Sequence, residues 1–156
     1  MRRHPLPSRI AGTFLLSLAS VAFAADTPAD PPPADDALAT ARGHVEAKRW
    51  PAALAELKRV NATRDADWNN LMGYTMRKQT PPDLDGAQRH YDAALHINPK
   101  HMGALEYSGE LALMKGDLAT AQARLAALAK LCSSPCEPLD DLKKSVASYK
   151  AKSGKV

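Results

Sequence analysis

Apolar positions recur along this chain with a period of 34 residues. Four kinds of position repeat at this spacing, once in each of three successive stretches: Trp50, Leu84 and Leu118; Ala53, Ala87 and Ala121; Leu57, Tyr91 and Leu125; and Val60, Ala94 and Leu128. Within a stretch the positions follow the spacing i, i+3, i+7 and i+10, which places them on one face of an α-helix. The recurrence therefore predicts three equivalent helices that begin near residues 50, 84 and 118.

The residues at these predicted starts suit helix N-termini. Asp83 and Asp117 stand in the N-cap position of two helices, where a carboxylate accepts hydrogen bonds from unpaired backbone N–H groups. Pro51 lies in the first turn of the other helix, where its missing N–H costs little.

Each of these helices follows another predicted helix that contains no proline, over residues 36–48, 67–79 and 102–115. Their apolar or small residues form stripes that consist of Ala37, Ala41 and His44; Asn69, Met72, Gly73 and Met76; and Leu105, Gly109 and Ala112. Ala41, Gly73 and Gly109 occupy matching positions, where a larger side chain would hold two helices apart. The sequence thus predicts three helix pairs within residues 36–131.

A last helix is predicted over residues 138–152, after a cysteine-containing loop at residues 132–137. Its apolar face carries Leu139, Leu142, Val146 and Tyr149. Acidic residues near its start and lysines near its end complement the helix dipole. A helix with one apolar and one polar face closes the exposed end of a repeat array.

Several of these residues also match a known repeat pattern. The third unit supplies Leu105, Gly109, Gly116 and Ala121 followed by Leu125, and the middle unit supplies Gly73, Ala87, Tyr91 and the closing Asn98-Pro99. The chain therefore resembles tetratricopeptide-repeat (TPR) proteins, whose pattern recurs at about 34 residues. The first unit is degenerate, because Ala41 replaces the glycine, His44 replaces the tyrosine, and no proline closes it.

The resemblance implies an all-α fold, an αα-hairpin solenoid of three TPR-like repeats with a C-terminal capping helix. A solenoid of unrelated helix pairs is the alternative. The resemblance also implies a concave groove, lined by the first helix of each unit, which binds a peptide or a partner's helix.

Candidates for partner binding lie on the first helix of each pair. They form a second stripe beside the apolar one. They are Arg42, Asn70, Tyr74, Arg77, Glu106, Tyr107 and Glu110. Tyrosine offers contact area at low entropic cost, and mixed charges beside it suit peptide recognition. Leu38 continues the stripe in the first unit. We expect these positions to form one surface, and we expect Tyr74→Ala paired with Glu110→Lys to abolish partner capture while lowering stability by no more than about 1 kcal/mol. Charges that are merely solvated are the alternative.

The N-terminus has the pattern of a secretory signal peptide. Residues 1–9 carry three arginines and no acid, residues 10–23 carry no charge, and Ala22-Phe23-Ala24 is an A-x-A cleavage site. We therefore expect a signal peptide at residues 1–24, a proline-rich linker at residues 25–35, and a mature protein without stable membrane insertion. It would be exported and, in a Gram-negative bacterium, periplasmic. An uncleaved N-terminal membrane anchor is the alternative.

The charge gives no sign of nucleic-acid binding. The formal net charge is +4, but removal of Arg2, Arg3 and Arg9 with the signal peptide leaves 18 basic against 17 acidic residues. No block of basic residues that would grip phosphates remains.

The search for catalytic chemistry finds no phosphate-binding loop, no nucleophile elbow and no zinc-protease motif. We therefore expect no enzyme activity and no cofactor. His44 is expected in or near the core. His96 and His101 approach across a turn, but a metal site normally needs three or four ligands. Glu106 and Glu110 resemble a carboxylate pair, yet no partner groups converge on them by sequence.

Cys132 and Cys136 are the only cysteines. In an exported protein the default is a disulfide, and Pro135 breaks the helix between them. The leading function is thus an envelope scaffold that binds a protein or peptide. The alternative is a small thiol-disulfide or metal-handling protein that uses these two cysteines.

Overall fold

Helices make up most of the residues that the structure describes. This computed structural model describes residues 37–133 and 135–154, so the predicted signal peptide and proline-rich linker lie outside the described residues. Seven helices and no strand occur in these ranges: α2 (Ala39–Glu46), α3 (Trp50–Val60), α4 (Ala66–Lys78), α5 (Leu84–Ile97), α6 (Met102–Met114), α7 (Leu118–Leu131) and α8 (Glu137–Ser153). The predicted all-α class is confirmed.

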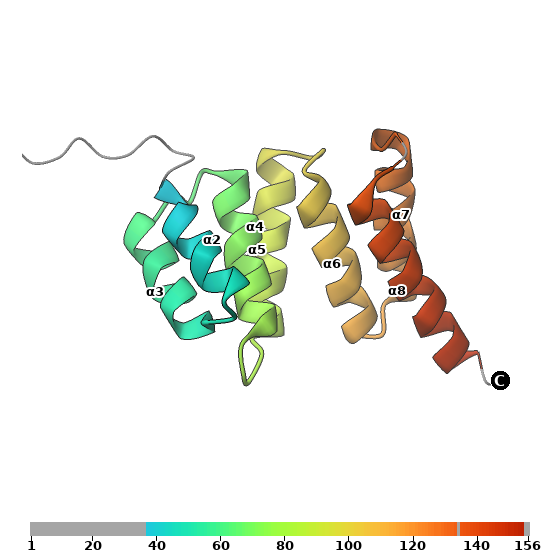
Figure 1. Ribbon diagram of the computed structural model, residues 1–156. Coiled ribbons are helices and arrows are strands. Elements are labelled where there is room, and N and C mark those ends of the chain that lie inside the picture. Colours follow the sequence, from blue (N-terminus) through green and yellow to red (C-terminus); the bar gives the residue numbers. More distant parts are fainter. Residues whose placement is uncertain (1–36, 134, 155–156) are drawn as a thin grey trace, which may run out of the picture. The chain divides into compact units, whose positions relative to one another are not determined.

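The helices are arranged as three antiparallel pairs and a final single helix (Figure 1). The pairs are α2 with α3, α4 with α5, and α6 with α7, and the second helix of each pair begins at the predicted residue. The helix predicted over residues 36–48 was longer than the observed α2. This helix ends at Glu46 because Lys48 adopts a left-handed backbone, with φ of 54°, which turns the chain toward α3.

The predicted helix starts have the expected caps. Asp83 accepts a hydrogen bond from the backbone N–H of Gly86, and Asp117 accepts one from that of Thr120. Pro51 lies in the first turn of α3. The sequence also held two caps that were not predicted: Asp65 at the start of α4, and His101, whose Nδ1 accepts the N–H of Ala104.

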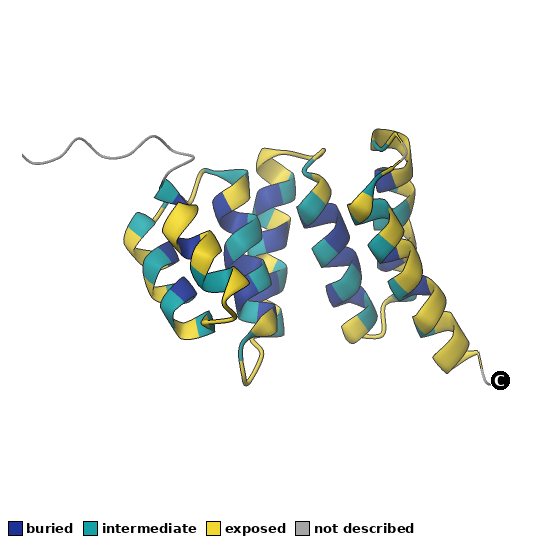
Figure 2. Cartoon of the chain, in the orientation of Figure 1, coloured by how far each residue is buried: buried dark blue, intermediate teal, exposed yellow. Residues whose placement is uncertain are grey.

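Of the twelve positions that recur at the 34-residue period, seven are fully buried, and the other five are half-buried, among them Trp50, Leu84 and Leu118 at the helix starts. Figure 2 shows buried residues along the second helices. Ala53, Leu57, Ala87, Tyr91, Ala94, Ala121 and Leu128 have no exposed surface. Asn69 is a polar member of the core. Its amide nitrogen donates to the carbonyl oxygens of Thr63 and Asp65, so its burial leaves no donor unpaired.

Two of the predicted small residues mark close helix contacts. A Cβ atom on Gly73 would lie 2.8 Å from the ring of Tyr91 in α5. A Cβ atom on Gly109 would lie 2.7 Å from a methyl carbon of Leu142 in α8 and 3.3 Å from Cβ of Arg124 in α7. Gly109 thus lets α6 approach two helices at once.

Helix α8 packs on α6 and α7 through the predicted apolar face, of which Leu142 and Val146 are buried. Cys132 and Cys136 are joined by a disulfide between α7 and α8, with a Cα–Cα distance of 5.8 Å. No helix in the described ranges is both long enough and apolar enough to span a lipid bilayer.

Candidate functional site

One face of the helical array carries a row of three hollows. It is formed by α2, α4, α6 and α8, and we call it the first-helix face. The α2 hollow, of about 360 Å³, lies among α2, the first residue of α3, α4 and α6, and its lining includes Arg42, Trp50, Asn70, Tyr74 and Tyr107. The second and third hollows lie among α4, α6 and α8, and they share Arg77, Lys78 and Glu110. Adjacent hollows have lining residues in common, so the row is continuous.

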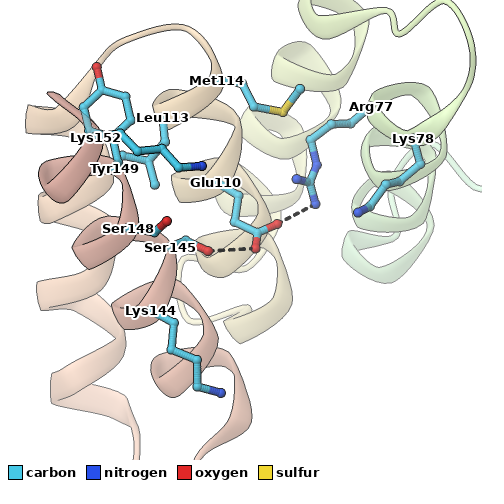
Figure 3. A pocket seen from close by; sticks show the side chains of 10 residues that line it. All are labelled: Arg77, Lys78, Glu110, Leu113, Met114, Lys144, Ser145, Ser148, Tyr149 and Lys152. Carbon is cyan, nitrogen blue, oxygen red and sulfur yellow. Dashed lines mark hydrogen bonds and ion pairs between the residues drawn. The ribbon is translucent and has the colours of Figure 1, made fainter.

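The second hollow is dominated by carboxylates, and we call it the acidic hollow. Its volume is about 350 Å³, and its lining consists of Tyr74, Arg77, Lys78, Gly103, Glu106, Tyr107, Glu110, Glu137, Pro138 and Asp141. The third, which we call the lysine hollow, has a volume of about 540 Å³ and includes Lys78, Lys144 and Lys152 (Figure 3). The face therefore changes sign along its length.

The structure places all seven of the predicted partner-binding residues on this face. Arg42 and Asn70 line the α2 hollow, Arg77, Glu106 and Glu110 line the acidic hollow, and Tyr74 and Tyr107 line both. Leu38 was predicted to continue this surface stripe, and that prediction was wrong. It is 3% exposed and packs with Ala41, Leu57, Trp68 and Met72, because it precedes α2 on the side that faces the core.

Aromatic side chains run along the middle of the face. The rings of Trp50 and Tyr74 are 6.3 Å apart, and those of Tyr74 and Tyr107 are 4.8 Å apart. Tyr91, which is fully buried, lies beneath them with its ring 6.4 Å from that of Tyr107. The aromatic row therefore connects the α2 hollow with the acidic hollow, and packing from below holds it in place.

Arg77 is a buried cation, although the sequence suggested a surface residue. Its side chain is 5% exposed, its Cζ lies 5.5 Å from the ring centroids of both Tyr74 and Tyr107, and its Nη2 lies 2.8 Å from Oε2 of Glu110. Burial opposes its charge, but the neighbouring Tyr91 and Glu110 raise the pKa of Arg77 overall. Arg77 therefore stays charged, and that charge is already neutralised by Glu110.

Glu110 is held from two sides (Figure 3). Besides its ion pair with Arg77, its Oε1 accepts a hydrogen bond of 3.3 Å from Oγ of Ser145 in α8. A change such as Glu110→Lys would leave Arg77 buried beside a second cation, so the expected cost of about 1 kcal/mol or less was too low for this position. The Arg77–Glu110–Ser145 connection joins α4, α6 and α8.

Glu106 differs from its neighbour Glu110 because nothing pairs with it. It is 8% exposed, and within the described residues no hydrogen bond or ion pair reaches its carboxylate. Burial, with the nearby charges of Glu110 and Asp141, raises the pKa of Glu106 to about 7. Most of the Glu106 side chain is buried, but its carboxylate oxygens keep accessible surface and face the acidic hollow. A carboxyl group that is largely desolvated and lies near like charges is a poor choice for stability alone.

The charged side chains at the α2 end of the face are more exposed than Arg77. Arg42 lies 3.7 Å from Asp67, which in turn lies 2.9 Å from Nε2 of His101. Asn70 Oδ1 is buried and has no hydrogen-bond partner in the described ranges. His101 is occupied as a cap and as a partner of Asp67, and within the described part of the chain no group of three or more His, Cys, Asp or Glu side chains is arranged to hold a metal.

The residues that sequence reasoning missed come mainly from α8. Glu137, Asp141 and Ser145 line the first-helix face at the spacing i, i+4 and i+8. This spacing was visible as a polar stripe beside the apolar face of the last helix. The sequence analysis assigned the acidic residues of this helix only to the helix dipole, whereas α8 also packs on α6 as a fourth first helix would. Neither cysteine lines any of the three hollows.

The fold, with three helix pairs at a 34-residue period and a covering helix, is a TPR-like helical repeat. No protein-family model matches the sequence, and no curated protein matches it significantly. Solved structures do match. The chain is similar to the Yersinia enterocolitica type III secretion translocator chaperone SycD, with a TM-score of 0.66, 18% identity, and coverage of 77% of this chain and 85% of SycD.

It is also similar to SycD in complex with a peptide of the translocator YopD, with a TM-score of 0.63 and 16% identity. That match covers 76% of this chain and 93% of the SycD chain. At such low identity these likenesses concern the fold alone.

Proposed function

We propose that this protein is a scaffold that binds an extended or helical segment of a partner protein along the first-helix face. The observation that carries the proposal is the continuous row of three hollows across four helices, with an aromatic row along its middle. A row of this kind fits a chain segment better than a compact small molecule, because side chains of a segment can enter successive hollows.

Two further observations support a peptide ligand. The exposed parts of Trp50, Tyr74 and Tyr107 supply rigid contact area of the kind that dominates binding energy at interfaces. SycD, which shares the fold, has been solved with a peptide of a translocator bound.

We also propose that the scaffold is exported and works in the cell envelope. The signal-peptide pattern at residues 1–24 and the pair Cys132 and Cys136 support this location, since disulfides persist in oxidising compartments. N-terminal sequencing of protein recovered from the periplasm should give Ala25 as the first residue. Recovery of a chain that still begins at Met1 would contradict the proposed export.

The binding proposal can be tested by selecting a phage-displayed library of random 12-residue peptides on the purified full-length chain. We expect enriched peptides to lose at least about tenfold in affinity when Tyr74 is changed to Ala, because a central aromatic contact is removed. Arg89→Glu, an exposed change on α5 away from the first-helix face, is the matched control. If Arg89→Glu removes binding and Tyr74→Ala does not, the ligand binds the second helices and the proposal fails.

A further inference from the structure

We propose that the acidic hollow receives a basic side chain, lysine or arginine, from the bound segment. This inference rests on the proposed function and adds the chemistry of the partner. The hollow is built by three helices that are far apart in the sequence, α4, α6 and α8. It would fix the register of the segment on the first-helix face, because only one position of the segment would meet it.

The charges that line the hollow leave a negative excess. Four carboxylates, Glu106, Glu110, Glu137 and Asp141, face two cations, Arg77 and Lys78. Arg77 is already paired with Glu110 at 2.8 Å. Lys78 places its Nζ over the ring of Tyr74, 5.5 Å from the centroid. Neither cation pairs with the other three carboxylates within the described residues. Of these three, Asp141 pairs with Lys144 at 2.9 Å, so Glu106 and Glu137 are the two that have no cationic partner in the described part of the chain.

Glu106 is the group that points most directly to a cationic ligand. It is more than nine-tenths buried, it lines the hollow, and it has no partner in the described part of the chain. The other carboxylates can be solvated or paired outside the hollow, as Asp141 is with Lys144 at 2.9 Å. A ligand ammonium or guanidinium group would give Glu106 the charge-assisted hydrogen bond that the protein itself does not supply.

The walls of the hollow suit the rest of a long basic side chain. Tyr74, Tyr107 and Pro138 offer apolar surface beside the carboxylates. Lysine and arginine carry a methylene stem that packs on such surface while the charged head reaches a polar group. An acidic side chain at the same position would meet several carboxylates at short range, so the hollow also selects against acidic segments.

Occupation of the hollow would make binding depend on pH. The groups that face Glu106 are Tyr74, Arg77 and Lys78 on α4, Tyr107 and Glu110 on α6, and Glu137 and Asp141 on α8. The free protein holds Glu106 half-protonated near pH 7, since its pKa is raised to about 7. A bound cation favours the carboxylate, so affinity for a basic segment should rise as the pH rises from about 6 to about 8, and a proton is released on binding.

The test uses the tightest peptide from the display selection on the full-length chain. Each basic residue of the peptide is replaced in turn by norleucine, and affinities are measured by fluorescence anisotropy for wild type, Glu106→Gln and the control Asp85→Asn. Asp85 is an exposed carboxylate on α5 that lines none of the three hollows. We expect one replacement to weaken binding to wild type by about tenfold or more. In Glu106→Gln the same replacement should change the logarithm of the affinity by less than half as much, and in Asp85→Asn it should have its full effect.

Two outcomes would overturn the inference while the proposed function stands. In the first, no norleucine replacement weakens binding although Tyr74→Ala still removes it. In the second, the replacement weakens binding to Glu106→Gln as much as it weakens binding to wild type. If no peptide binds, the proposed function fails and the inference fails with it. A second measurement needs no selected peptide. N-acetyl-lysine methylamide is added to the protein, with the norleucine analogue as the uncharged control, and the pKa of Glu106 is followed by NMR through its side-chain carboxyl carbon. The lysine compound should lower the pKa of Glu106 and the norleucine compound should not. An unchanged pKa at saturating lysine compound would also overturn the inference.

Discussion

Arg77 and Glu106 are both charged residues that the chain buries on the first-helix face, but with opposite consequences. Arg77 forms an ion pair with Glu110 and lies over the rings of Tyr74 and Tyr107, so its charge is compensated within the protein, although its buried Nε has no hydrogen-bond partner among the described residues. Glu106 has no such partner among the described residues. The first residue therefore contributes to the structure of the face, while the second leaves an unmet interaction open to a ligand.

We predict that Glu106→Gln stabilises the free protein at neutral and higher pH. The folded state holds the pKa of Glu106 at about 7, above its ordinary value of 4.5. The folded state therefore binds this proton more tightly than the unfolded state does. The resulting contribution to the free energy of unfolding is fully present below about pH 4.5 and is lost as the pH rises through about 7. Glutamine mimics the neutral form, so the variant should be more stable by on the order of 1–2 kcal/mol at pH 8 and equal to wild type near pH 4.5.

Urea unfolding of wild type and Glu106→Gln at pH 4.5, 6, 7 and 8 would measure this difference. Glu46→Gln serves as the control, because Glu46 is exposed and its replacement should change stability by less than about 0.5 kcal/mol at each pH. A constant difference between Glu106→Gln and wild type across the series would show that ionisation of Glu106 does not oppose folding.

The burial and the partners of individual side chains were predicted less well from the sequence than the helices were. The stripe that holds Tyr74, Arg77, Glu106 and Glu110 followed from helical periodicity alone. The burial of Arg77 and Glu106 did not, because it depends on which helices lie opposite, including α8, which contributes Glu137 and Asp141 to the acidic hollow. A periodic pattern reports the direction of a side chain on its own helix, and it carries no information on which other helix lies opposite.

At the scale of the helices, small residues decide how closely neighbours approach. We predict that Gly109→Leu destabilises the protein by about 1–3 kcal/mol, because its side chain would collide with Leu142 and Arg124. The matched control is Gly43→Ala on α2, where no atom lies within 4 Å of the added Cβ. That change should stabilise by about 0.5–1 kcal/mol, since alanine is the better helix former. Thermal unfolding of both variants measures the two effects, and equal melting temperatures would contradict the assigned packing of α6 against α8.

The disulfide between α7 and α8 is expected to be a structural link. Closing so short a loop restricts the unfolded chain and contributes about 2 kcal/mol. The double change of Cys132 and Cys136 to Ala should therefore lower the free energy of unfolding by about that amount and leave peptide binding within about twofold, because neither cysteine lines a hollow. Mass spectrometry before and after reduction should show a gain of two hydrogens. A reactive thiol in the oxidised, exported protein would instead favour a thiol-disulfide function.

Helices were predicted better than single residues because their signals are local or periodic. The 34-residue recurrence located α3, α5 and α7, and Asp83 and Asp117 marked two starts. The end of α2 was missed because nothing in the sequence signalled the left-handed backbone at Lys48, a residue that rarely adopts it. The part of α8 in the first-helix face was missed because its polar stripe resembles a solvated surface.

At the scale of the whole described array, each helix pair is stabilised mainly by the pairs next to it, as in other repeat proteins. The α4–α5 pair has neighbours on both sides, and the α6–α7 pair is covered by α8 through Leu142 and Val146. The α2–α3 pair has a neighbour on one side only, and α2 is a helix of 8 residues without a side-chain cap. Stability should therefore be lowest at the α2 end.

We predict that amide hydrogen exchange is fastest in α2 and α3 and slowest in α4 to α7, because opening the end pair exposes only one interface. Trp68 provides a sharper test, since its Nε1 donates a buried hydrogen bond of 2.8 Å to the carbonyl oxygen of Leu57 in α3. Trp68→Phe removes this link at a cost of about 0.5–1.5 kcal/mol, while the Leu57 carbonyl oxygen keeps its hydrogen bond from the backbone N–H of Asn61 at 3.0 Å. Exchange should then accelerate in α2 and α3 and change little in α6 and α7. If all the helices accelerate equally, the array unfolds as one cooperative unit and the nearest-neighbour description is wrong for this protein.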